Sequence, residues 1–317
     1  MFNGKKEADL TRLHDLLGEL RDLAAQNPKD GMVRTHLSRG LFSAFAHSTG
    51  EDDAFQRDRI LQELRDLAAE HPEDEVVRGN LSRALFNALN YAHQEGDGER
   101  RDRALEELRA LAIEHPADGV IQEHLAKGLF NGLNYAWEEN HRARQDELLE
   151  ELRRLAAHDA ERAGVRLRFA KGLFNTLSHL AERKEVSAAG ELLDELRELH
   201  RAAPSDDEVR ARFAKGAATL LQLRSRGGEC QEAHRLLDEL RELSAAEPGD
   251  PALRESLAIG LSEVLECAGK DDEPSFREEL LEELRILVAE SPESGSLRAR
   301  LASGLVSEMA LIGERDG

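Results

Sequence analysis

The sequence predicts an all-α protein, a right-handed α-solenoid of seven helix-hairpin repeats with about fourteen antiparallel helices. The first observation is the tripeptide Glu-Leu-Arg, which recurs seven times at a fixed step of 44 residues. The second is that no insertion or deletion interrupts this step, and repeat periods of about 20–50 residues are typical of stacked repeats. We therefore expect one domain, residues 1–317, with units centred near Leu20, Leu64, Leu108, Leu152, Leu196, Leu240 and Leu284.

Each unit opens with the helix that carries Glu-Leu-Arg, here called helix B. In the third unit, Leu105, Leu108 and Leu111 lie on one face of this helix, and charged residues fill the other face. This pattern is that of an amphipathic helix. Helix B ends near a proline, which lacks the N–H that a helix interior needs. The proline column is Pro28, Pro72, Pro116, Pro204, Pro248 and Pro292, with Ala160 as the exception.

The second helix of each unit, helix A, follows two residues after the proline. In the third unit, Asp118 stands where its side chain can cap the free N–H groups of this helix. An apolar column of branched residues then marks the buried face, as Ile121, Leu125 and Leu129 do here. A column of small residues (Gly40, Ala84, Gly128, Gly172, Gly216, Gly260 and Gly304) and a column of phenylalanines (Phe42, Phe86, Phe130 and Phe174) flank this face. We expect the phenylalanine of one helix A to pack over the small residue of a neighbouring helix A.

The paired antiparallel helices, the closing proline and the small residues at the helix crossing resemble the tetratricopeptide repeat family. The leucine–glycine pair of that family corresponds loosely to Leu125 and Gly128. The period of 44 residues exceeds the 34 residues of that family, so HEAT-type repeats of about 40–47 residues remain an alternative. Either resemblance implies a curved superhelix that presents a concave surface, and both families usually act as adaptors for other proteins.

The stripe of helix A opposite its apolar column holds cations and amides at spacings of i, i+4 and i+7. The resemblance implies that helix A lines the concave groove, so we expect a ladder of binding groups there in units two to five. Amides can both donate to and accept from a peptide backbone, and lysines suit carboxylates. An ordinary solvated helix face is the alternative. The expected partner-binding residues are Arg39, Arg83, Asn87, Asn90, Lys127, Asn131, Asn134, Lys171, Asn175, Ser178 and Lys215.

The net charge limits the kind of partner. Lys and Arg total 43 against 64 Asp and Glu, which gives a net charge of −21. A body this acidic repels nucleic acid and anionic lipid at long range. We therefore expect a protein-interaction scaffold whose partner is a protein or peptide with carboxylate or other anionic groups. Recognition of single-stranded RNA by successive repeats, a sensor or regulatory module of a larger assembly, and self-association are the open alternatives.

No motif in the sequence predicts catalysis. The His-Glu-x-x-His metal motif and a phosphate-binding glycine loop are both absent, so we expect no enzyme, no cofactor and no metal site. The recurring arginine of Glu-Leu-Arg has an acid or amide three residues earlier in six of seven units, which favours an ion pair within or between repeats. Cys230 begins one helix and Cys267 ends the next, so the two could approach. Two cysteines are too few for a disulfide framework, so a buried or free thiol pair in a reducing compartment is expected. With no apolar segment of about 20 residues, a cytoplasmic location is predicted.

Overall fold

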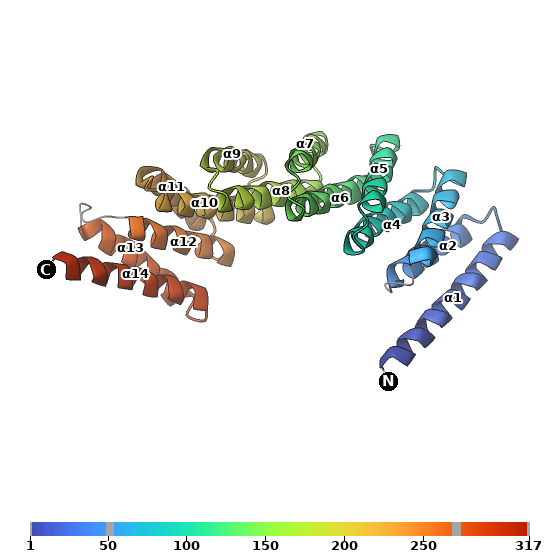
Figure 1. Cartoon of the computed structure of the whole chain (residues 1–317), viewed down its shortest axis with the longest axis horizontal. Coiled ribbons are helices and arrows are strands. Elements are labelled where there is room, and N and C mark those ends of the chain that lie inside the picture. The colour runs from blue at the N-terminus through green and yellow to red at the C-terminus, as the bar shows by residue number, and fades with distance from the viewer. Residues whose placement is uncertain (1, 49–53, 268–273, 316–317) are drawn as a thin grey trace. The chain divides into compact units, whose positions relative to one another are not determined.

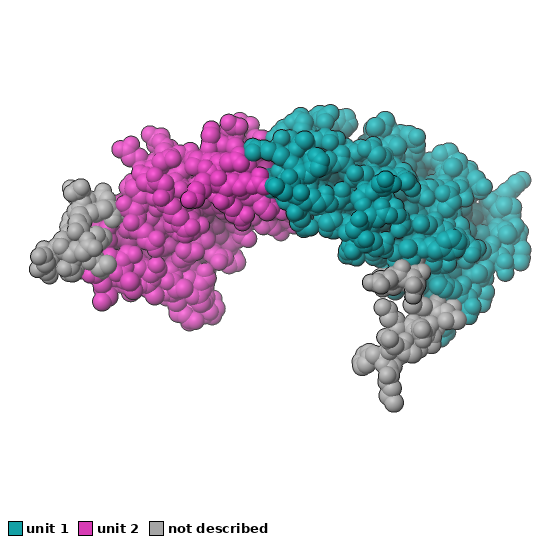
Figure 2. Space-filling view, in the orientation of Figure 1, with its two compact units in different colours: residues 1–168 teal, residues 169–317 magenta. Residues whose placement is uncertain are grey.

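The chain is an all-α solenoid of helical hairpins, with fourteen helices and no strand among the residues described (Figure 1). The computed structural model describes the backbone of residues 2–48, 54–267 and 274–315 and the side chains of 12–48, 54–267 and 275–309. The chain divides into two compact units, Met1–Arg168 and Phe169–Gly317, which Figure 2 shows in different colours. The fold class predicted from the repeats is confirmed.

In unit 1 each helix packs against its neighbours in the sequence, and each helix A also packs against the next helix A. The odd-numbered helices are the B helices and carry Glu-Leu-Arg, whereas the even-numbered helices are the A helices. The helices are α1 (Phe2–Gln26), α2 (Gly31–His47), α3 (Ala54–Glu70), α4 (Glu75–Gln94), α5 (Gly98–Glu114), α6 (Gly119–Glu138) and α7 (Arg142–His158).

In unit 2 the same alternation continues, and α10 packs directly on α12, as α12 does on α14. The boundary between the two units lies within α8. The helices are α8 (Ala163–Glu182), α9 (Val186–Ala202), α10 (Asp207–Arg226), α11 (Cys230–Ala246), α12 (Pro251–Cys267), α13 (Pro274–Glu290) and α14 (Gly295–Arg315).

The two kinds of turn repeat as closely as the helices do. At the start of α6, the Asp118 carboxylate accepts from the N–H groups of Val120 at 3.1 Å and Ile121 at 3.3 Å, as an N-cap should. The A-to-B turns place one residue with positive φ at the same register in four successive repeats, which glycine tolerates best. These residues are Gly96 (71°), Asn140 (54°), Lys184 (61°) and Gly228 (80°).

The Glu-Leu-Arg motif holds successive B helices together. In unit 1, Arg109 Nε donates to Glu151 at 2.8 Å, so that the arginine of one motif pairs with the glutamate of the next. The same pair recurs at a separation of 42 residues, and several of these pairs are bidentate, a strong geometry for arginine and carboxylate. The ion pairs predicted for this arginine are therefore confirmed both between repeats and within the helix, where Arg109 also pairs with Glu106 at 2.6 Å. The other pairs between repeats are Arg21–Glu63, Arg65–Glu107, Arg197–Glu239 and Arg241–Glu283.

The small-residue column of helix A receives leucines of helix B, not phenylalanines. A Cβ atom on Gly128 would lie 3.2 Å from Leu108 Cδ1 and 3.4 Å from Leu105 Cδ1. The predicted packing of phenylalanine over this column is therefore wrong. Phe86 instead stacks on the ring of His124 in the next helix A, with ring centroids 6.4 Å apart. The leucines of helix B need the space that glycine leaves, because they insert between two A helices.

Replacing Gly128 by leucine should lower the free energy of unfolding of unit 1 by about 1–3 kcal/mol through overpacking. Urea unfolding followed by the fluorescence of Trp137, which lies on the same helix, measures the change. Gly18→Leu is the matched control, since no atom lies within 4 Å of the Cβ position at Gly18. Equal urea midpoints for the Gly128→Leu variant and the parent would show that the close contact between Gly128 and the leucines of helix B does not contribute to stability.

Candidate functional site

The cations predicted to bind a partner form a column along the A helices of unit 1. Arg39, Arg83 and Lys127 lie on α2, α4 and α6, one residue to each helix and 44 residues apart. Arg39 and Arg83 are exposed and Lys127 is half-buried. Within the described part of the chain, Arg39 and Lys127 make no hydrogen bond or ion pair through their side chains. The guanidinium of Arg83 lies over the ring of Phe42, 5.1 Å from its centroid.

The asparagines beside this column, Asn87, Asn90, Asn131 and Asn134, are half-buried. Asn131 Nδ2 donates to Asn90 Oδ1 at 2.8 Å, and the Tyr135 hydroxyl donates to the same oxygen at 2.7 Å. Asn90 in turn donates to the carbonyl oxygen of Phe86 at 3.0 Å. Asn90 and Asn131 therefore join α4 to α6, a structural role that the repeat pattern alone did not indicate.

A buried histidine lies under the cation column. The ring of His124 is 6% exposed, and its Nδ1 is 2.7 Å from the Ser82 hydroxyl of α4. Burial, together with the charges of Lys127 and Arg83, lowers the pKa of His124 to about 4, against a smaller opposite effect of Asp118. Both cations and His124 line one hollow of about 530 Å³ between α4 and α6.

In unit 2 the predicted binding residues lie on two helices. Lys171, Asn175 and Ser178 are on α8 and Lys215 is on α10, and all four are half-buried. The Ser178 hydroxyl donates to its own helix, to the carbonyl of Phe174 at 2.9 Å.

On α12, the next A helix of this unit, the column of cations and amides is replaced by other residues. Glu263 replaces the amide there and is 3% exposed. It accepts a hydrogen bond from Gln222, and its Oε1 lies 3.3 Å from Arg226 Nη2. The position of the cation column is Ile259 on this helix, so the column of cations ends at α12.

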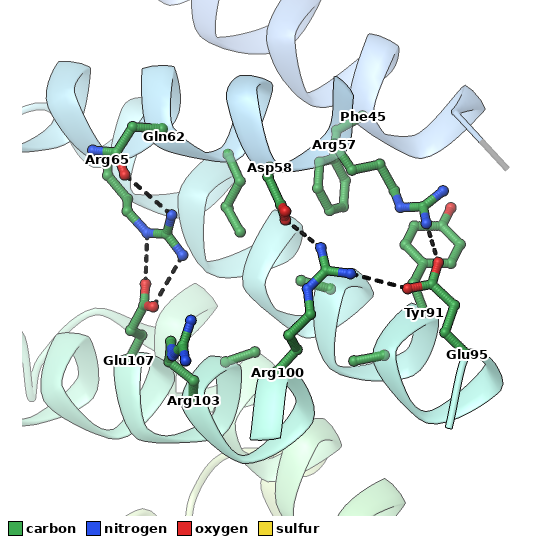
Figure 3. A pocket seen from close by; sticks show the side chains of 14 residues that line it. Phe45, Arg57, Asp58, Gln62, Arg65, Tyr91, Glu95, Arg100, Arg103 and Glu107 are labelled. Carbon is green, nitrogen blue, oxygen red and sulfur yellow. Dashed lines mark hydrogen bonds and ion pairs between the residues drawn. The ribbon is translucent and has the colours of Figure 1, made fainter. Parts of the chain in front are cut away.

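A second surface, which the sequence analysis missed, is a pocket of about 390 Å³ between α3, α4 and α5 (Figure 3). Arg57 lies at one end, 3% exposed, and donates to the Ser48 carbonyl at 2.7 Å. It also pairs with Glu95 and lies over the ring of Tyr91, 5.0 Å from the centroid. Burial raises the pKa of the Tyr91 hydroxyl.

Ion pairs link the two B helices across this pocket. Arg100 of α5 pairs with Asp58 of α3 and, at 3.1 Å, with Glu95. Arg65 of α3 donates to both oxygens of Glu107 of α5, at 2.7 and 2.9 Å. The sequence contained a signal for these pairs, namely their recurrence at the repeat step. The pairing of Arg57 with Glu95 recurs 44 residues on as Arg101 with Glu139, and that of Arg100 with Asp58 recurs as Arg144 with Asp102.

The two cysteines form a disulfide. Cys230 is the first residue of α11 and Cys267 the last residue of α12, and their Cα atoms are 6.0 Å apart. The prediction of free thiols is therefore wrong. The helix pair is antiparallel, so it brings the start of one helix beside the end of the next. Disulfides are rare in reducing compartments, so one argument for a cytoplasmic location is lost.

No protein-family model matches the chain, and no curated protein is significantly similar to it. The fold and the 44-residue repeat thus define the class, an all-α helical-repeat protein. Among the residues described, no helix is both long and apolar enough to cross a membrane. In the same part of the chain, no group of three or more His, Cys, Asp or Glu side chains is arranged to hold a metal ion.

Proposed function

We propose that this protein is a tetratricopeptide-like interaction scaffold that binds an acidic, extended segment of a partner protein on the helix A face of unit 1. The observation that carries the proposal is the column Arg39, Arg83 and Lys127. These cations have no carboxylate partner among the residues that the structure describes, in a chain of net charge −21. Most other arginines of unit 1 are paired with acids. Charge left unpaired at regular steps suits an anionic partner.

The spacing of the column sets the kind of segment it fits. Neighbouring packed helices lie roughly 8–10 Å apart, and an extended chain rises about 3.3 Å per residue. An extended peptide that crosses α2, α4 and α6 would therefore meet a new cation about every third residue. The preferred sequence carries Asp or Glu at every third position. The hollow around Lys127 and His124 gives room for one such side chain.

The test is the binding of a fluorescent peptide with glutamate at every third position, measured by anisotropy at low salt. The variant Arg39→Gln/Arg83→Gln/Lys127→Gln should bind about 3- to 150-fold more weakly, since exposed ion pairs contribute about 0.2–1 kcal/mol each. The matched control removes three exposed cations of B helices, Arg59→Gln/Arg154→Gln/Arg235→Gln, whose side chains are 63%, 70% and 73% exposed. It changes the net charge equally and should retain binding.

Equal loss in both triple variants would mean that only overall charge matters and would reject the proposed face. The same assay with a single-stranded RNA distinguishes the nucleic-acid alternative. If the RNA binds more tightly than the acidic peptide, and its affinity falls steeply as salt is added, the proposed function is RNA recognition and not that of a protein scaffold.

A further inference from the structure

We propose that the pocket between α3 and α5 is a second binding site, which takes a small organic oxyanion: a carboxylate or phosphate on an apolar stem. The pocket is lined by B helices and the adjoining part of α4, and it shares no residue with the cation column of the A helices. Its ligand would therefore be independent of the partner proposed above. Its volume of about 390 Å³ falls in the usual range for small-molecule sites.

The charges of the pocket favour an anion. Four arginines and three carboxylates line it, so the described lining carries one excess cation within an acidic chain. Arg57, Arg65 and Arg100 are each held by a carboxylate. Arg103 makes no hydrogen bond or ion pair with any residue that the structure describes. Its guanidinium is the group that an oxyanion would satisfy.

The positions of the donors suit an oxyanion at the mouth of the pocket. Figure 3 shows Arg65, Arg100 and Arg103 around the same opening, on two different B helices. A guanidinium has five N–H donors. Arg65 uses three of them for Glu107 and Gln62, and Arg100 uses two for Glu95 and Asp58, so both keep donors for a ligand. An anion placed there can receive hydrogen bonds from more than one guanidinium.

The interior of the pocket suits an apolar stem. Leu61, Ala92 and Ala104 lie along it and are 5%, 3% and 4% exposed, and Phe45 is 1% exposed. A ring or short alkyl chain would cover these side chains, while its charged end stays at the arginines. The combination of an apolar interior and few polar groups at the mouth is typical of small-molecule sites.

The next repeat carries different residues at several of the positions that line the pocket. There the residue corresponding to Arg103 is Glu147, and the one corresponding to Ala104 is Leu148. Leu148 Cδ1 lies 3.5 Å from the Cβ position of Gly132. The counterpart of Gly132 in the pocket is Ala88, so a leucine in place of Ala104 would extend towards Ala88 and into the pocket. The charge also reverses. The corresponding positions hold the arginines Arg101, Arg109 and Arg144 and the acids Asp102, Glu106, Glu139, Glu147 and Glu151.

These differences supply two matched variants. Arg103→Glu and Ala104→Leu each introduce the residue that the next repeat carries at the same position. The first reverses the unpaired charge, and the second occupies the space for the stem. Arg103 is exposed, so Arg103→Glu should leave the urea midpoint and the circular dichroism spectrum unchanged.

The experiment titrates phenyl phosphate and phenylacetate into the full chain, with calorimetry or ligand-observed NMR as the readout. The two anions distinguish phosphate from carboxylate as the preferred group. Phenylmethanol tests the stem without charge, and inorganic phosphate tests the charge without a stem. We expect at least one aryl anion to bind at least tenfold more tightly than either of these. We expect Arg103→Glu to weaken its binding by about 10- to 100-fold, as for loss of a charge-assisted hydrogen bond.

Either of two results with the aryl anions would by itself overturn the proposal. One is that neither binds at about 10 mM, and the other is that the better ligand binds the parent and Arg103→Glu equally well. If Ala104→Leu remains folded, its failure to weaken binding would also overturn it, because the stem then lies elsewhere. The Arg39→Gln/Arg83→Gln/Lys127→Gln variant should bind the aryl anions as the parent does, so the failure of one proposal leaves the other testable.

Discussion

Replacing Cys230 and Cys267 by serine should lower the free energy of unfolding of the α11–α12 hairpin by about 4 kcal/mol in the chain-entropy account. The disulfide closes a loop with a sequence separation of 37 residues and joins the two ends of this hairpin. Without it, the unfolded segment regains the conformations that the cross-link excludes. The effect should be local, because each repeat contacts only its neighbours and stability sums over repeats.

Amide hydrogen exchange, resolved by segment, measures this change. We expect faster exchange across α11 and α12 in the double-serine variant and little change in α3–α6. Reduction of the parent with dithiothreitol should reproduce the effect, and the same reductant should not alter the variant. Identical protection of α11 and α12 in the oxidised parent and the variant would mean that the bond contributes nothing to the stability of this hairpin.

The second large effect expected is a loss of stability of unit 1 on mild acidification, caused by His124. The pKa of His124 in the folded chain is lowered to about 4, below the ordinary value of 6.5. The unfolded chain therefore binds more protons between these two values. The stabilisation is fully present above about pH 6.5 and is lost as the pH falls towards 4. Between pH 7.5 and pH 5 the loss should be about 2 kcal/mol.

The chain itself provides the matched variant for this measurement. One repeat earlier, Asn80 stands in place of His124 and donates to the Ser38 hydroxyl at 2.9 Å, as His124 contacts Ser82 at 2.7 Å. His124→Asn should keep the hydrogen bond and lose the titration. Urea unfolding at pH 7.5 and pH 5, followed by Trp137 fluorescence, should show a pH effect smaller by about 2 kcal/mol in the variant. An unchanged difference between the two pH values would rule out His124 as the cause.

The repeat pattern predicted the fold because every unit carries the same short-range signals for where a helix forms and where it ends. These signals are the leucines of helix B, the proline that ends it, and the N-cap of helix A, which is Asp118 in the third unit. They act within a few residues of one another. Seven copies in register make the assignment of helices redundant, so one missing proline at Ala160 does not alter it. The ion pairs of Glu-Leu-Arg could also be predicted, since a charge that recurs in every unit must find its partner in the same unit or the next.

The contents of the candidate sites were less accessible to sequence reasoning. The cation column could be found, because Arg39, Arg83 and Lys127 recur at one register on a polar stripe. The hydrogen bond from Asn131 to Asn90 could not be predicted, because it depends on how closely α4 approaches α6. The pocket of Figure 3 could not be predicted either. Ala104 lines it where the next repeat has a leucine, and the smaller side chain leaves a cavity only because α3 and α5 pack on either side of it.

The sequence by itself determined the class of fold, the length of the repeat, the turn between helix B and helix A, and the regular placement of charge. All of these depend on contacts between residues close in the chain. Only the tertiary structure decided that Gly128 receives leucines of helix B, that Cys230 and Cys267 form a disulfide, and that Arg103 lines a cavity without a partner among the residues described. These features depend on distances between helices. Packing sets those distances to fractions of an ångström, and no spacing along the chain records them.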